Sequence, residues 1–125
     1  MTRFDPCFSR TKIRRFAHLI RPTYEAIEAL VGRRGAWPAR IECMTPGEIR
    51  EGRRTGAGHG LYLGDQRRIK INAGMDSLAI YANFVHENLH HARPDLTEVE
   101  VDGLTDVVMA YVAVVVSART PRSPR

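Results

Sequence analysis

Hydrophobic residues recur every three or four positions along a segment that opens the last two fifths of the chain. This segment begins at Asp76 or Ser77 and reaches about Ala92, and Pro94 follows it closely. Such spacing places apolar side chains on one side of a helix, and a proline cannot continue it. The expected core face of this helix comprises Leu78, Tyr81, Ala82, Val85 and Leu89.

A second helical pattern starts at Thr97, which forms a capping-box signature with Glu100. Its most apolar stretch, Val107 to Val116, is shorter than the roughly 20 residues that a membrane span requires. We therefore expect a buried core helix that folds back antiparallel to the first one across the short turn at 93–96. The expected core positions are Val101, Leu104, Val108, Tyr111, Val112 and Val115.

Apolar and polar residues alternate in shorter segments, which are typical of strands. Residues 39–44, 61–63 and 68–72 are the candidates, and the last two are joined by a turn and predict a β-hairpin. Helices are also indicated at 11–20 and from Pro22 to Gly32 or Gly35, and residues 45–46 indicate a helix start or a turn. A glycine-rich loop is expected at 52–60. The predicted fold class is α+β, with a small, about three-stranded sheet packed on helices.

The chain has 125 residues, which is enough for one hydrophobic core and too few for two. We expect a single domain over residues 1–118 and a disordered basic tail over residues 119–125. The N-terminus lacks the apolar region of a secretory signal, so a cytoplasmic protein is expected. Cys7 and Cys43 show no metal-binding or disulfide spacing, which indicates reduced thiols.

The formal net charge is +5, and much of the positive charge occurs as arginine doublets. A basic surface is compatible with a nucleic-acid partner. The doublets lie in separate segments without interleaved aromatic residues, so a nucleic-acid partner is possible but not favoured. The four doublets are Arg14-Arg15, Arg33-Arg34, Arg53-Arg54 and Arg67-Arg68.

The sequence His86-Glu87-Asn88-Leu89-His90 has the form H-E-x-x-H. Residues four apart lie one turn apart on the same side of a helix, so His86 and His90 can both reach one zinc ion. Glu87 then lies beside the ion without binding it and can act as a general base toward a zinc-activated water. The motif predicts one zinc ion per chain.

A third ligand is available after the turn, where Glu98, Glu100 and Asp102 are the candidates. Glu100 is expected in the capping box. Counting back from the turn slightly favours Asp102, whereas Glu98 is nearer the turn and has the longer side chain. The residues by themselves leave the identity of the third ligand open. His91 points about 100° away from His90 around the helix and is not a natural third ligand, and His59 lies in the glycine-rich loop.

H-E-x-x-H followed by Glu98 and Asp102 as E-x-x-x-D resembles the gluzincin arrangement of thermolysin-like peptidases. This resemblance implies that Glu98 is the third zinc ligand and that Asp102 orients His86 through its other ring nitrogen. Seven residues separate His90 from Glu98, fewer than in the usual gluzincin loop. Asp102 therefore stays the alternative third ligand.

Residues 60–104 more closely resemble the small single-domain, minigluzincin-like zincins of bacteria and phages. The matching segments are GLYL at 60–63, RRIKIN at 67–72 and HENLHHARPDLTEVEVDGL at 86–104. The resemblance implies a zincin-like fold in which an edge strand before the metal helix binds extended peptide by β-augmentation. Strand 67–72 would take that part, with Arg68, Lys70 and Asn72 as substrate-binding residues.

The function expected from these observations is that of a zinc-dependent metallopeptidase, with a peptide or protein substrate. The alternative is a binding or regulatory module with a structural or vestigial metal site, which contacts nucleic acid or a partner protein through its basic surface. A closed set of four ligands, with His91 or Asp102 as the fourth, would favour this alternative. The substrate specificity, the oligomeric state and the role of residues 1–22 stay open.

Overall fold

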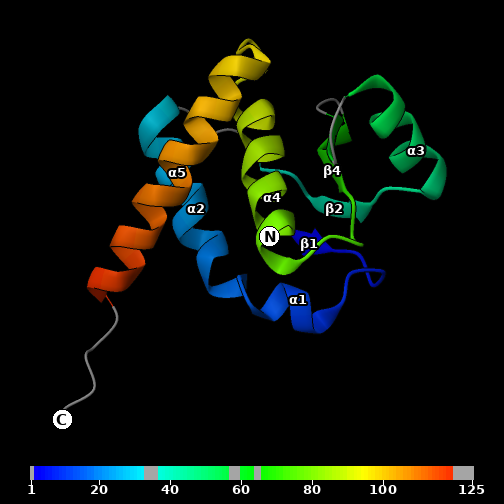
Figure 1. The fold of residues 1–125 in the computed structure, drawn as a ribbon. Coiled ribbons are helices and arrows are strands. Elements are labelled where there is room, and N and C mark those ends of the chain that lie inside the picture. The colour runs from blue at the N-terminus through cyan, green and yellow to red at the C-terminus, as the bar shows by residue number, and fades with distance from the viewer. Residues whose placement is uncertain (1, 33–36, 57–59, 64–65, 120–125) are drawn as a thin grey trace.

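The structure of the chain is a computed structural model that describes residues 2–32, 37–56, 60–63 and 66–119. The described residues form five α-helices and four short strands (Figure 1). In chain order these are β1 (Arg3–Phe4), α1 (Arg10–Arg14), α2 (Ile20–Val31), β2 (Arg40–Cys43), α3 (Pro46–Thr55), β3 (Gly60–Leu63), β4 (Arg68–Ile71), α4 (Ser77–Ala92) and α5 (Glu98–Arg119). The predicted α+β class is confirmed.

The sheet has four strands in the order β1-β2-β4-β3. β1 and β4 are both parallel to β2, and β3 is antiparallel to β4. The predicted hairpin and the predicted strand at 39–44 are confirmed. The expected count of about three strands is wrong, because two-residue β1 is too short to produce an alternating pattern.

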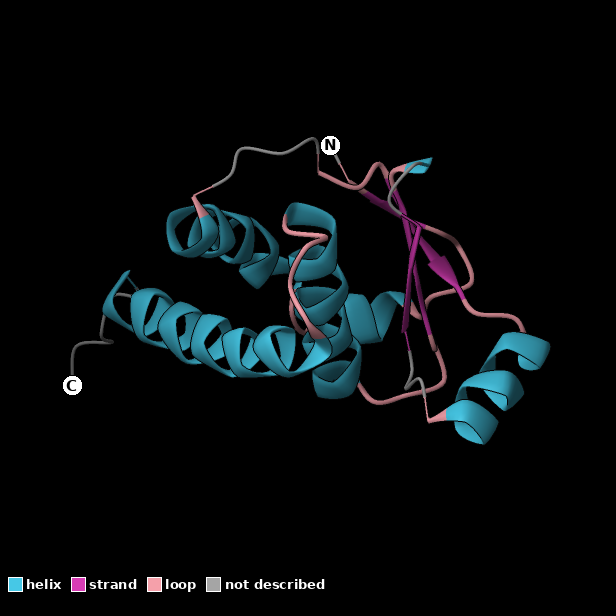
Figure 2. Ribbon diagram, turned by 90° about the horizontal axis from the view of Figure 1, so that it is seen from above, coloured by secondary structure: helices cyan, strands magenta, loops and turns pink. Residues whose placement is uncertain are grey.

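One face of the sheet is covered by helices and forms the core. Ile41, Ile69 and Ile71 are fully buried on this face. Figure 2 shows α2, α4 and α5 grouped on one side of the sheet and α3 on the other. On the α3 side, the ammonium group of Lys70 lies 3.0 Å from a carboxylate oxygen of Glu48. The alternation of strand β4 therefore separates an apolar face from a charged one.

The N-terminal segment, whose role the sequence left open, supplies aromatic side chains to this core. Phe4, Phe8 and Phe16 pack together, and Phe4 stacks on Phe84 of α4 with ring centroids 5.8 Å apart. Further along, the ring of Tyr24 stacks on Trp37 at 4.3 Å. These aromatic side chains therefore complete the hydrophobic core.

Helix α4 forms where the sequence predicts it. Asp76 is its N-cap, and its carboxylate accepts a hydrogen bond of 2.8 Å from the amide of Ala79. The expectation that Leu78 faces the core is wrong, since 67% of this residue is exposed. Ile80 and Phe84 are fully buried instead, because α4 lies between the sheet and the other helices and is buried on more than one side.

Helix α5 begins with the predicted capping box. The Glu100 amide donates to the Thr97 hydroxyl at 3.2 Å, and the Thr97 amide donates to the Glu100 carboxylate at 3.0 Å. Val108 and Val112 are buried as expected. Tyr111 is half exposed, so its expected place in the core is wrong.

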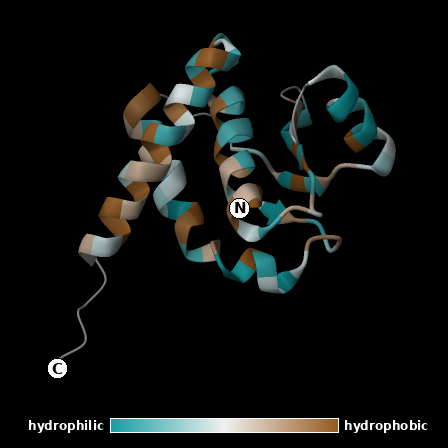
Figure 3. Ribbon diagram, in the orientation of Figure 1, coloured by the Kyte–Doolittle hydropathy of each residue, from teal (hydrophilic) through white to brown (hydrophobic). Residues whose placement is uncertain are grey.

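The apolar stretch of α5 is not a fully buried core helix. By length and composition, residues 98–118 could cross a membrane, and 22% of that apolar window is buried in the fold. Val107 and Val114 lie on the side of α5 that faces solvent. Periodicity alone gave no indication of this second apolar face, because the outward residues are as hydrophobic as the inward ones (Figure 3).

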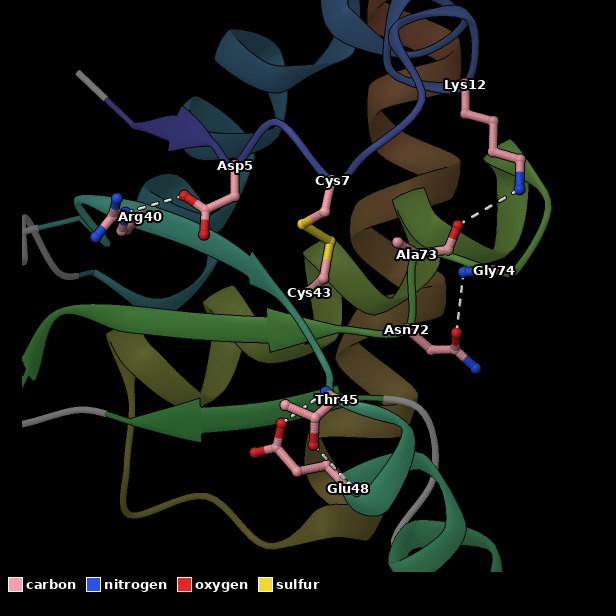
Figure 4. The surroundings of a disulfide bond; sticks show 10 residues. All are labelled: Asp5, Cys7, Lys12, Arg40, Cys43, Thr45, Glu48, Asn72, Ala73 and Gly74. Carbon is pink, nitrogen blue, oxygen red and sulfur yellow. Dashed lines mark hydrogen bonds and ion pairs between the residues drawn. A yellow bond between two sulfur atoms is a disulfide. The ribbon is translucent and has the colours of Figure 1, made fainter.

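Cys7 and Cys43 form a disulfide bond, so the expectation of reduced thiols is wrong. Figure 4 shows the bond between the loop after β1 and the end of β2. The cysteines are 36 positions apart in the sequence, and the parallel pairing of β1 with β2 brings them together. Sequence spacing could not indicate this pairing, because it depends on the sheet register.

Two predicted boundaries also change. Helix α3 continues to Thr55 and ends at Gly56, whose φ is +74°, so residues 52–55 are helical and not part of a loop. Gly32, with a φ of +68°, ends α2 as one of the two predicted glycines. Arg119 still belongs to α5, and the rest of the expected tail, 120–125, lies outside the described residues.

Candidate metal centre

The two histidines of the H-E-x-x-H motif face each other on α4. Their Nε2 atoms are 3.2 Å apart, and both side chains are largely buried. Val85 and Leu89, next to these histidines in the sequence, are fully buried and fix that side of the helix against the core. The helix therefore presents both imidazoles at the border between the core and solvent.

Glu98 reaches both of these nitrogen atoms from the first turn of α5. Its Oε1 lies 2.7 Å from Nε2 of His90, and its Oε2 lies 3.2 Å from Nε2 of His86. The capping box of Thr97 and Glu100 sets the start of this helix, so it also sets the position of Glu98. Glu100 is thereby engaged in the cap, as the sequence predicted.

Asp102 approaches His86 from the other side of the ring. Its Oδ1 lies 3.2 Å from Nδ1 of His86. The two carboxylates of the E-x-x-x-D pattern therefore face different ring nitrogens. Glu98 lies with the two Nε2 atoms, whereas Asp102 is placed to orient the imidazole of His86.

The donor atoms of His86, His90 and Glu98 fit a divalent cation. Ligand atoms about 2.0–2.1 Å from a tetrahedral zinc ion lie roughly 3.3 Å from one another. The separations here are 3.2 Å between the two Nε2 atoms, 3.2 Å from Nε2 of His86 to Oε2 of Glu98, and 2.7 Å from Nε2 of His90 to Oε1 of Glu98, so the two distances to Glu98 involve different oxygens. The groups whose ligand atoms lie close enough together to hold a metal ion are His86, Glu87 and His90, and His86, Glu98 and Asp102. Two imidazoles and one carboxylate suit zinc, and this set also suits iron when more positions stay open.

Glu87 is 5% exposed, and its carboxylate lies close enough to His86 and His90 for the three residues to form one of the groups that could hold a metal ion. Its Oε2 is 4.0 Å from Nε2 of His86. Burial, and secondly the nearby charge of Glu98, raises the pKa of the Glu87 carboxyl to about 8. A carboxyl with such a raised pKa can hold and release a proton near neutral pH.

Gly60, the first residue of β3, packs directly against Glu87. A Cβ atom at position 60 would lie 2.5 Å from Oε2 and 2.9 Å from Cδ of Glu87, well inside van der Waals contact. Only a glycine at this position leaves the Glu87 side chain where it is. The sequence pattern around Gly60 does not indicate this role, because it arises from the contact between β3 and α4.

An open cleft of about 490 Å³ gives access to these groups. It lies between α4 and α5 and is bounded by the start of β3. Its lining comprises Gly56, Gly60, Ala82, Asn83, His86, Glu87, Glu98, Asp102, Thr105 and Asp106. His86, Glu98, Asp102 and the buried carboxyl of Glu87 therefore face one solvent-accessible space, whereas His90 is not among its lining residues.

The residues expected to bind substrate are held elsewhere. Arg68 forms an ion pair with Glu42, and Lys70 forms one with Glu48. The side-chain oxygen of Asn72 accepts a hydrogen bond from the amide of Gly74 at 2.9 Å. None of the three lines the cleft between α4 and α5.

The expectation that strand 67–72 is an edge strand open to β-augmentation is wrong. β4 is paired on both sides, with β2 and β3, so it cannot accept a further strand. The outer strand beside α4 is β3. A hairpin pattern does not reveal which of its two strands lies at the edge, because that depends on the pairing of β4 with β2.

The aromatic ring of Tyr62 in β3 borders the histidines. It stacks near His90 with ring centroids 6.1 Å apart. It also meets the ring of His91 edge-on at 5.5 Å, so His91 packs against β3. His59 lies outside the described residues.

Comparisons of the chain with protein-family models, curated proteins and solved structures found no match. A functional interpretation therefore depends on the geometry of the site.

Proposed function

We propose that this protein is a zinc-dependent metallopeptidase with a zincin-like architecture. The observation that carries the proposal is that two carboxylates face different nitrogen atoms of the histidines. Glu98 faces the Nε2 atoms of both histidines, and Asp102 faces Nδ1 of His86. This placement resembles the gluzincin arrangement, in spite of the short connection between the two helices, and it supports the proposal.

In this proposal His86, His90 and Glu98 hold one zinc ion per chain. When bound, the ion supplies Lewis-acid chemistry, because it polarises a substrate carbonyl and lowers the pKa of a water molecule. Asp102 accepts a hydrogen bond from Nδ1–H of His86, which fixes the tautomer with a free Nε2 lone pair.

Glu87 is the general base and, later, the general acid. In the metal-free protein burial favours its protonated form, and a nearby divalent cation favours the carboxylate. The carboxylate can then take a proton from the attacking water and deliver it to the leaving amine. Gly60 keeps this side chain in place at the wall of the cleft.

An extended peptide fits the outer edge of β3 better than the expected strand β4. β3 starts at Gly60, in contact with Glu87, so a peptide that pairs with its edge passes the metal-binding candidates. The cleft is open and shallow, which suits a flexible peptide segment.

The proposal is tested by zinc content and peptide cleavage in three variants. His90→Ala should lose the zinc, whereas His91→Ala, on the next residue of the same helix, should keep it. Glu87→Gln should keep about one zinc per chain and the fold but lose cleavage of an unstructured protein such as casein by a factor of about 10³ or more.

Zinc-free wild-type protein after incubation with zinc and removal of the excess would rule out the metal site. Zinc binding without cleavage, unchanged in Glu87→Gln, would favour the alternative of a binding module with a structural or vestigial metal site. The basic surface gives that alternative little support, because several arginines already pair with carboxylates in the fold. Such pairs are Arg21–Glu25, Arg40–Asp5, Arg54–Glu51, Arg68–Glu42 and Arg93–Asp95.

A further inference from the structure

A second, smaller pocket lies on the α3 side of the sheet, the face opposite the core (Figure 2). It has a volume of about 130 Å³ and lies between α3 and the start of β3, where Met44, Gly52, Gly60 and Leu61 line it. The main hydrophobic core of the described residues includes neither Met44, which is 6% exposed, nor Leu61. These residues therefore form a separate apolar spot on the otherwise charged face of the sheet.

The register of β3 against β4 places successive residues of β3 on different faces. Leu61 pairs with Lys70, and side chains of directly paired residues lie on the same face of a sheet. Lys70 reaches Glu48 of α3, so Leu61 also lies on the α3 side. Gly60, one position earlier, faces α4, where it contacts Glu87. The start of β3 therefore borders the cleft with one residue and the small pocket with the next.

Gly60 borders both spaces. It lines the cleft together with His86 and Glu87, and it lines the small pocket together with Leu61 and Gly52. Because glycine has no Cβ, no side chain at position 60 separates the two. The small pocket therefore adjoins the cleft at the point where β3 begins, next to the proposed general base.

The polar groups in the wall of the small pocket already have partners. The carboxylate of Glu48 lies 3.0 Å from the ammonium group of Lys70. The carboxylate of Glu51 pairs with Arg54, and the hydroxyl of Thr55 donates to the carbonyl oxygen of Glu51 at 2.9 Å. A charged or strongly polar ligand group would lose its water here without gaining an unengaged partner, which is unfavourable. The pocket therefore suits an apolar group.

We propose that this pocket binds one branched aliphatic side chain, such as that of leucine or valine, from a peptide that pairs with the edge of β3. The proposal rests on the proposed function, because the peptide is the substrate of the metal centre. Side chains of an extended peptide alternate between the two faces of the sheet that it joins. When one residue faces the cleft beside Gly60, its neighbour faces the α3 side and reaches the pocket. Pockets for alternate side chains supply the specificity in this mode of binding.

The volume of the pocket limits the side chain that it accepts. An apolar cavity of about 150 Å³ holds a benzene molecule. The 130 Å³ available here therefore suits leucine or valine and excludes the indole group of tryptophan. Loss of even one methylene group from a side chain in such a pocket lowers the efficiency of cleavage about tenfold or more. We expect at least this preference for leucine over glycine.

Cleavage of a proteome-derived peptide mixture by the zinc-loaded protein tests this specificity. Mass spectrometry of the fragments gives the amino-acid preference at each position around the cleaved bonds. One position close to the cleaved bond should favour leucine and valine over glycine by about tenfold or more. Aspartate, lysine and tryptophan should be disfavoured at the same position.

Two variants change the pocket in opposite directions. Gly52→Leu should fill it and shift the preference at that one position to glycine and alanine, whereas Leu61→Ala should enlarge it and shift the preference to phenylalanine. Arg53→Leu changes an exposed residue next to Gly52 on α3, so this control should keep the wild-type profile. Circular dichroism and zinc content check that each variant is folded, and either folded pocket variant suffices for the comparison. A general loss of stability would lower all cleavage without changing the preference at one position.

The outcomes separate this inference from the proposed function. Cleavage without a preference at any position, or a profile that the folded pocket variants share with wild type, would overturn the role of the pocket and leave the metallopeptidase proposal intact. Equal changes in the Arg53→Leu control would also overturn it. Absence of cleavage by the zinc-loaded wild type would overturn both proposals.

Discussion

At the scale of single residues, the most constrained contact in the cleft joins Gly60 to Glu87. The glycine lies in a strand and the glutamate in a helix, and they are 27 positions apart in the sequence. Their contact fixes the carboxylate that we propose as the general base. The position of the Glu87 carboxylate therefore depends on how β3 packs against α4.

Substitution of Gly60 by alanine should displace the Glu87 carboxylate, because the new Cβ would lie 2.5 Å from Oε2. We expect peptide cleavage to fall about 100-fold with zinc content unchanged, since a displacement of about 1 Å can have this effect. Gly47→Ala is the control, because its Cβ would meet its nearest neighbour only at 3.9 Å. Equal cleavage rates for the two variants, measured at saturating zinc, would contradict this role for Gly60.

The residues of the candidate site were predictable to different degrees. The H-E-x-x-H spacing is local to one helix, so His86, Glu87 and His90 were identified from the sequence. The sequence by itself did not decide whether Glu98 or Asp102 is the third candidate ligand, because both lie on the same side of the next helix. The tertiary contact between α4 and α5 places them on different nitrogens of His86.

At the scale of elements, two capping boxes of the same kind begin two helices, and only one of these helices carries a candidate metal ligand. Thr97 and Glu100 start α5, which carries Glu98 in its first turn. Thr45 and Glu48 start α3, on the far side of the sheet (Figure 4). The pair therefore offers a matched comparison of helix stability with and without a proposed metal ligand nearby.

Thr97→Ala and Thr45→Ala should each lower the free energy of unfolding by about 1 kcal/mol, since each removes a side chain that accepts a backbone N–H. Only Thr97→Ala should also weaken zinc binding, by several-fold, because it loosens the turn that holds Glu98. Urea unfolding of the zinc-free proteins and competition with a chelating dye measure the two effects. Equal zinc affinities in both variants would show that the cap does not position the ligand.

The types of the helices and strands were largely predictable from the sequence. The way in which these elements pair and pack was not. Capping residues, glycines and periodicity identified α2, α4, α5 and the hairpin, because these signals act within a few residues. Local patterns do not indicate β1, and they do not show that β4 is paired on both sides. The order of strands depends on pairing between segments far apart in the chain, and local patterns contain no such information.

At the scale of the whole molecule, the N-terminal segment is joined to the rest by one covalent and several polar links. The Cys7–Cys43 disulfide attaches the loop after β1 to the end of β2. The ammonium group of Lys12 donates to the carbonyl oxygen of Met75 at 2.7 Å, next to the start of α4. These links hold the aromatic residues of the first segment in the core.

Replacement of both cysteines by serine should lower the free energy of unfolding by roughly 2–4 kcal/mol, since the disulfide restricts the unfolded chain over a loop of 36 positions. Urea unfolding of the oxidised protein and of the double variant measures the difference. Zinc content should not change, because neither cysteine lines the cleft. Identical unfolding curves would indicate that the disulfide does not form in the purified protein.

The disulfide weighs against the expected cytoplasmic location, because such bonds are rare in the reducing cytosol. The exposed apolar residues of α5, such as Val107 and Val114, are the other property that appears only at this scale. Apolar residues on both sides of a helix give a sequence pattern without a preferred face, so only the packed molecule separates the covered side from the outer one.

The sequence by itself determined the features that depend on neighbours along the chain. These are the histidine pair on one helical turn, the caps, the hairpin and the α+β class, each produced by side chains within a few residues of one another. Tertiary structure decided the strand order, the disulfide, the contact of Gly60 with Glu87 and the nitrogen atom that each carboxylate faces. These depend on distances between elements, which packing of the whole core sets and which no local pattern contains.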